Sequence, residues 1–121
     1  MKVNFQITKS FAKDLKKFGI NEQHVISDQI NKYGSILTQR RKVRSRQLYQ
    51  PYQIELTGNL DSSLYVLKVA RNIRVILAID EDPIFDQFLI TLLRVVKADE
   101  AEQAYMDVSQ SLYQPLFAQA Q

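Results

Sequence analysis

The sequence predicts an α+β fold in the order β-α-α-β-β-β-α, an antiparallel sheet with an N-terminal helical hairpin packed on one face. Two observations predict it. Residues 64–96 form three apolar runs whose connectors are too short for a parallel crossover, which is typical of an antiparallel meander. Residues 10–37 repeat apolar side chains at helical spacing on either side of Gly19, as two helices packed on a sheet would.

The chain begins with a strand and the helical hairpin. Residues 2–8 alternate polar and apolar side chains, as a half-buried strand does. The first helix is expected to bury Phe11, Leu15 and Phe18 and to end at Gly19. The second is expected to start at Asn21 and to weaken near Gly34. Its apolar stripe comprises Val25, Ile26, Ile30, Tyr33 and Leu37.

Side-chain alternation fixes the register of the meander. On one strand Tyr65, Leu67 and Val69 face away from Lys68, and on the next Ile73, Val75, Leu77 and Ile79 face away from Arg74. Matching these apolar sets requires a three-residue turn or a bulge at 70–72. Lys68 and Arg74 then become cross-strand neighbours, and such like charges destabilise a sheet. If Arg94 joins them, three cations share one face and a negatively charged partner is a natural inference.

The chain is expected to form one domain, 1–121, that closes with a helix over about 99–114. Asp99 is a good N-cap, and Glu100 and Glu102 suit the first turn of a helix. Pro115 should end or bend this helix. Its apolar stripe comprises Ala101, Tyr105, Val108, Leu112 and Leu116.

Composition excludes several classes of protein. The chain has no cysteine, which rules out disulfides and thiolate metal sites and fits the cytoplasm. Its single histidine, His24, cannot build a histidine cluster, so we expect no metal site and no cofactor. No apolar run reaches the roughly 18 residues that a membrane-spanning helix needs, so we expect no membrane partner.

Charge is distributed unevenly along the chain. Residues 1–79 hold 14 Lys and Arg against 5 Asp and Glu, whereas residues 80–121 hold 2 against 8. The basic part suits a polyanion. A run of cations over 39–46 is either a solvated helix end or a phosphate-tracking patch, and the tyrosines that follow could stack on bases. The candidate RNA-binding residues are Arg40, Arg41, Lys42, Arg44, Arg46, Tyr49 and Arg71.

The order of elements and several motifs together resemble the RelE/ParE superfamily of type II toxin–antitoxin toxins. The most telling feature is a Tyr-x-Leu-x-Val strand followed by an Arg-Val-Ile strand and an acidic turn. The resemblance extends to about Tyr105. The motifs are Leu56-Thr-Gly58, Leu64-Tyr-Val-Leu-Lys-Val69, Ile73-Arg-Val-Ile76, Ile79-Asp-Glu-Asp82 and Leu93-Arg-Val-Val-Lys97.

The resemblance implies a concave basic sheet face opposite the helices and an antitoxin that wraps the toxin. One branch of the superfamily cleaves messenger RNA in the ribosomal A site, and the ParE-like branch inhibits DNA gyrase. Partners would be the antitoxin, the ribosome and its messenger RNA, in a homodimer or a toxin–antitoxin hetero-oligomer. Matching the motifs position by position gives the candidate catalytic residues Lys68, Arg74, Arg94, Lys97 and Tyr105.

RNA cleavage without a metal is chemically consistent with these residues. The ribose 2′-hydroxyl attacks the adjacent phosphorus, Arg74 and Arg94 would clamp the phosphate, and a lysine could act as the base. Three functions stay open: a ribosome-dependent messenger RNA endonuclease, a gyrase inhibitor, and a catalytically inactive relative that acts as a binding module. The acidic Ala98-Asp99-Glu100, where basic residues are common in the superfamily, favours the last.

Overall fold

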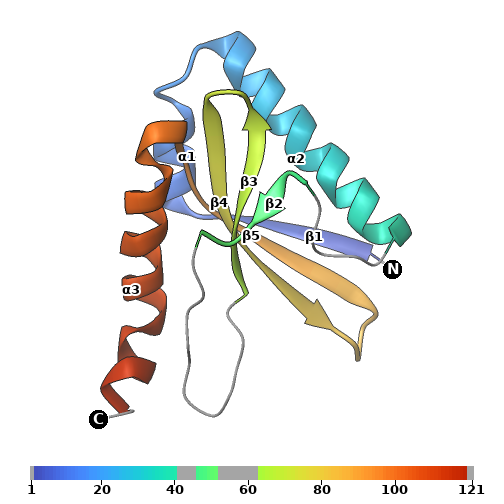
Figure 1. Ribbon diagram of the computed structural model, residues 1–121. Helices are drawn as coiled ribbons and strands as arrows, with labels where there is room; N and C mark the ends of the chain where they lie inside the picture. The colour runs from blue at the N-terminus through green and yellow to red at the C-terminus, as the bar shows by residue number, and fades with distance from the viewer. Residues whose placement is uncertain (1, 41–45, 52–62, 120–121) are drawn as a thin grey trace.

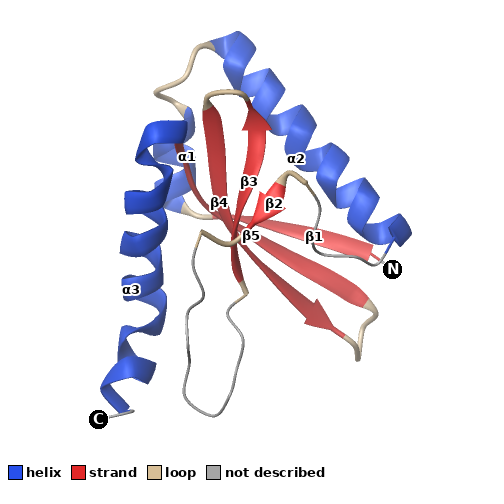
Figure 2. Cartoon of the chain, in the orientation of Figure 1, coloured by secondary structure: helices blue, strands red, loops and turns tan. Residues whose placement is uncertain are grey.

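The computed structural model describes residues 2–40, 46–51 and 63–119 and confirms the α+β fold (Figure 1). A five-stranded sheet lies between helices that cover both of its faces (Figure 2). The elements are β1 (Lys2–Ile7), α1 (Lys9–Leu15), α2 (Ile20–Arg40), β2 (Leu48–Tyr49), β3 (Leu64–Ala70), β4 (Ile73–Asp82), β5 (Gln87–Lys97), a 3₁₀ turn η2 (Ala98–Glu100) and α3 (Ala101–Gln119).

The strand order is β1-β5-β4-β3-β2. The expected meander of β3, β4 and β5 is antiparallel throughout. β1 pairs with β5 in parallel, from Lys2 opposite Gln87 to Ile7 opposite Leu92, so the sheet is mixed at this edge. The short strand β2, absent from the predicted order, adds to the other edge beside β3.

The β3–β4 register agrees with the side-chain alternation in the sequence. Leu67 lies opposite Val75, and Lys68 lies opposite Arg74. A bulge between Lys68 and Ala70 then brings Ala70 opposite Ile73, as the matching of apolar sets requires. The prediction that Lys68 and Arg74 are cross-strand neighbours is therefore confirmed.

The helical hairpin covers one face of the sheet. From α2, the residues Ile26, Ile30, Tyr33 and Leu37 are buried against β3, β4 and β5, whereas Val25 is exposed. Gly34 neither ends nor interrupts α2. A Cβ atom at Gly34 would lie 2.8 Å from Cζ of Phe5, so glycine allows the Phe5 ring of β1 to approach the helix closely.

Helix α3 covers part of the opposite face, where the resemblance implied an open basic surface. Its residues Ala101, Ala104 and Tyr105 are buried against this face. Tyr105 is 0% exposed, and its hydroxyl donates to the carbonyl oxygen of Leu64 at 2.9 Å. The sheet residues of this second core are apolar too, so both faces need cover. They are Leu64, Val66, Ile76 and Val96. The helix continues through Pro115, which was expected to end or bend it, to Gln119.

Helix α1 packs beside the last residues of β5, where β1 no longer pairs with that strand. The Thr8 side chain caps α1 by accepting from the backbone N–H of Phe11 at 3.2 Å. One turn later, the buried carboxylate of Asp14 accepts from the backbone N–H of Val95 on β5 at 3.2 Å. The same carboxylate accepts from Nε of Arg94 at 2.5 Å and from its Nη2 at 3.3 Å. Asp14 thus links helix α1 to β5 through these hydrogen bonds.

We predict that Tyr105→Ala lowers the free energy of unfolding by about 3–5 kcal/mol, because it leaves a cavity in the second core. The adjacent Met106 is 39% exposed, and Met106→Ala is expected to change it by less than about 0.5 kcal/mol. Urea unfolding followed by circular dichroism measures both. Equal effects of the two substitutions would contradict the packing of α3 on the sheet.

We also predict that Asp14→Ala lowers the free energy of unfolding by about 2–3 kcal/mol, because a buried N–H and a partly buried guanidinium lose their partner. Asp28 is an exposed acid on α2, and Asp28→Ala serves as the matched control. A double-mutant cycle between Asp14 and Arg94 measures their coupling directly. A coupling energy near zero would show that the pair does not hold α1 on β5.

Candidate functional site

The face that α3 covers also carries a strip of polar side chains, here called the exposed strip, which consists of the exposed Tyr49 and Lys68 and the half-buried Arg74. Tyr49 lies opposite Val66, a residue of the second core, and Lys68 lies opposite Arg74. Because side chains two apart on a strand share a face, all three project to the α3 side of the sheet. Tyr49 is 40% exposed, so an aromatic ring and two cations from three adjacent strands are gathered here.

Lys68 is the most available cation of the exposed strip. Its side chain is exposed, and it forms no hydrogen bond or ion pair within the described part of the chain. Its backbone N–H donates to the carbonyl oxygen of Gln47 at 2.7 Å, which fixes the start of the side chain. A charged lysine held opposite Arg74 without a carboxylate partner is suited to an anion supplied from outside.

Arg74 is partly committed to the β3–β4 turn. Its Nη1 donates to the carbonyl oxygens of Ala70 at 2.8 Å, of Arg71 at 3.1 Å and of Ile73 at 3.1 Å. Its Nε and Nη2 donate to no other described residue. The turn therefore holds the guanidinium in place and leaves one of its edges for a ligand.

Two further candidate cations lie at the same end of the sheet. Arg71 is an exposed residue of the β3–β4 turn. Lys97 is exposed at the end of β5, opposite Ile73. The backbone N–H of the next residue, Ala98, donates to the carbonyl oxygen of Asn72 at 2.8 Å, which joins the end of β5 to the turn. Both cations thus lie near the exposed strip but are not on the sheet face that carries it.

Arg94 shares the sheet face of Lys68 and Arg74, since it lies opposite Ile76 of the second core, but its guanidinium is engaged elsewhere. A bulge at Leu93 shifts the β4–β5 register, and the Arg94 guanidinium binds Asp14 at the β5 edge. The hydrogen bond to Asp14 raises the pKa of Arg94, although partial burial opposes this; the charges of Asp14, Asp107 and Glu100 also raise it. Arg94 thus already has carboxylates around it and acts in the fold as a structural cation.

Tyr105, predicted to contact the substrate, lies in the core. It is 0% exposed, and its hydroxyl bonds to Leu64, so it reaches no ligand while α3 stays packed. Of the basic run, Arg46 is exposed beside β2 and Arg40 is the last residue of α2. Arg41, Lys42 and Arg44 lie outside the described residues. His24 is exposed in the first turns of α2, away from the exposed strip.

A pocket of about 170 Å³ lies between α2 and the β2–β3 edge, and Lys68 is part of its wall. The burial of Tyr33 raises its pKa above the usual range, and the charge of Tyr65 acts in the same direction, so the phenol stays neutral. The sequence analysis missed this pocket. The sequence feature that could have indicated the pocket is the spacing of Gln29, Lys32 and Ile36, which places them on one face of α2. The lining is Gln29, Lys32, Tyr33, Ile36, Gln47, Leu67 and Lys68.

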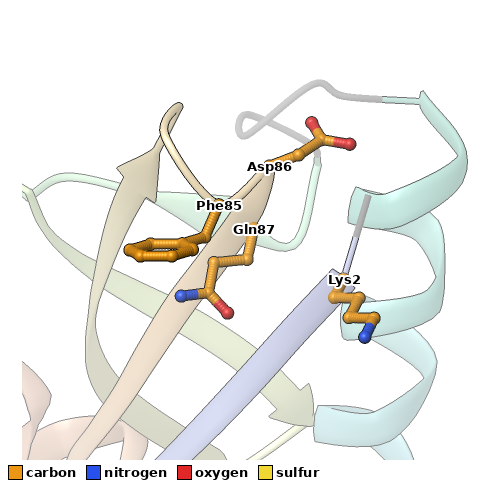
Figure 3. Close-up of a pocket in the computed structure, with 4 residues that line it drawn as sticks. All are labelled: Lys2, Phe85, Asp86 and Gln87. Atoms are coloured by element: carbon orange, nitrogen blue, oxygen red, sulfur yellow. The ribbon is translucent and has the colours of Figure 1, made fainter.

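A second, wider hollow of about 420 Å³ lies at the other edge of the sheet. Figure 3 shows its lining, Lys2 from β1 and Phe85, Asp86 and Gln87 from the β4–β5 hairpin. The hairpin tip is ordered by Asp82, whose Oδ1 accepts from the backbone N–H of Ile84 at 3.1 Å. This hollow contains none of the predicted site residues.

In residues 2–40, 46–51 and 63–119, no three His, Cys, Asp or Glu side chains are grouped so that they could hold a metal ion. None of the helices described there combines the length and the apolar character that crossing a bilayer requires.

Comparison with known proteins finds a structural similarity at low sequence identity. No family model and no curated protein matches the chain. Among solved structures, the chain is similar to the YoeB dimer from Staphylococcus aureus, with 15% sequence identity and a TM-score of 0.47. The match covers 78% of this chain and 94% of that one. At this level of similarity, function has to be inferred from the side chains themselves.

Proposed function

We propose that the chain is the toxin of a type II toxin–antitoxin pair and acts as a ribosome-dependent messenger RNA endonuclease in the cytoplasm. The observation that carries the proposal is the exposed strip, where Lys68 faces Arg74 across two strands and Tyr49 lies beside them. These side chains supply phosphate binding and base stacking from one surface. The resemblance of the β3 and β4 motifs to RelE/ParE toxins supports the same proposal.

The chemistry needs no metal. The 2′ oxygen of a ribose attacks the adjacent phosphorus, and its proton passes to water. The bond from phosphorus to the 5′ oxygen breaks, which leaves a cyclic phosphate and a 5′-hydroxyl. The free edge of Arg74 binds the phosphate oxygens, whose negative charge grows in the transition state, and the Lys68 ammonium protonates the departing 5′ oxygen.

A non-catalytic binding module is the second candidate function, and three observations favour it. Arg94 is paired with Asp14, and Tyr105 is buried. Nη1 of Arg74 is hydrogen-bonded to carbonyl oxygens of the β3–β4 turn. In this case the exposed strip would hold an acidic segment of a partner protein, such as the antitoxin. Binding then needs the positive charge of Lys68 but no proton transfer.

Expression of the chain without an antitoxin is predicted to arrest translation, with transcripts cut in the ribosomal A site. We expect Lys68→Gln to slow cleavage by about 10²–10³-fold, because it removes one positioned donor. The fold should persist, since Lys68 is exposed and its side chain has no partner in the described structure. Primer extension on ribosome-bound messages measures the cleavage.

Lys13→Gln is the matched control, because Lys13 is an exposed lysine on α1 and α1 contacts β5 rather than β3. It should cleave as the wild type does. Cleavage by Lys68→Gln at the wild-type rate would refute the role of Lys68. Normal growth with intact transcripts would favour the binding module, and DNA damage signalling with intact transcripts would favour a gyrase inhibitor.

A further inference from the structure

The pocket between α2 and the β2–β3 edge has a wall that combines cations, an amide and apolar side chains. Lys32 on α2 and Lys68 on β3 are both exposed cations at its border. Leu67 is 2% exposed and Tyr33 is 4% exposed, so these two side chains supply a rigid apolar floor. Among the residues that the structure describes, no carboxylate belongs to the lining. Such a wall attracts an anion that also carries an apolar surface.

The size of the pocket limits what it can hold. Its volume is about 170 Å³, below the roughly 300–1,000 Å³ typical of pockets for drug-sized ligands. It can therefore take in the base of one nucleotide, with the sugar and phosphate of a longer chain left outside. A base can lie against the floor, and its edge can exchange hydrogen bonds with the Gln29 amide, which has both donors and an acceptor.

Lys68 connects this pocket to the exposed strip. Within the described residues, β2 pairs with β3 through Leu48 and Tyr49. Lys68 follows Leu67, the last β3 residue that pairs with β2, and so lies at this edge of the sheet. Its side chain starts on the α3 face, beside Arg74, and the residue also belongs to the pocket lining at the edge of the sheet. A strand of RNA whose phosphate lies between Lys68 and Arg74 can therefore place its neighbouring nucleotide under α2.

We propose that this pocket is a subsite for one nucleotide of single-stranded RNA, next to the nucleotide whose phosphate is held by Lys68 and Arg74. Lys32 binds the phosphate of the pocketed nucleotide, and Gln29 contacts its base. The choice of RNA as the ligand rests on the proposed function. Selectivity for the residue beside the cut then arises from α2 and not from the strands.

The test measures binding of a short 2′-O-methyl RNA to the purified full chain by fluorescence anisotropy, because this RNA cannot be cleaved. Lys32→Gln should weaken binding about tenfold and lower the salt slope by about one counterion. Gln29→Ala should weaken binding and change the preference among oligonucleotides of different base. Lys13→Gln, the same charge change on α1, should cause a clearly smaller loss.

The outcomes separate this inference from the proposed function. If the wild type cleaves messages but Lys32→Gln and Gln29→Ala bind no worse than Lys13→Gln, the subsite is refuted and the nuclease stands. If the pocket variants lose RNA affinity but the wild type cuts nothing, the subsite stands and the nuclease is refuted. A wild type that does not bind the RNA refutes the subsite.

Discussion

The structure depends on the register in which β3 pairs with β4. That pairing places Leu67 and Val75 together in the core under the helical hairpin, and Lys68 and Arg74 together on the other face. A shift of β3 by one residue would move Lys68 into the first core and Leu67 out of it, which would bury a charge and expose an apolar side chain. The bulge before Ala70 lets the strands keep this register through the turn.

The second constraint is that both faces of the meander are largely apolar. The hairpin covers one, and α3 covers the part of the other that contains Val66 and Ile76. Lys68 and Arg74 lie toward the end of the sheet near β2 and the β3–β4 turn, whereas Arg94, on the same face, is paired with Asp14. The candidate site is thus a narrow strip beside a packed helix and not an open concave face.

The sequence was informative where neighbours along the chain decide the structure. Alternation on two adjacent strands was sufficient to predict the pairing of Lys68 with Arg74 and to require either a three-residue turn or a bulge, of which the structure has the bulge. It could not predict that Arg94 binds Asp14, because the two are 80 residues apart and several basic and acidic side chains could have been partners. Nor could the spacing on α3 show which sheet face buries Tyr105, since both faces offered apolar residues.

In the proposed complex, single-stranded RNA lies across Tyr49 and Lys68, with Arg74 on its phosphate. Photo-cross-linking with RNA that carries 4-thiouridine, followed by mass spectrometry of the modified peptides, tests it most directly. We expect cross-links to the peptides that contain Tyr49 and Lys68. Cross-links found only on the β4–β5 hairpin tip, or on the exposed side of α3, would contradict it.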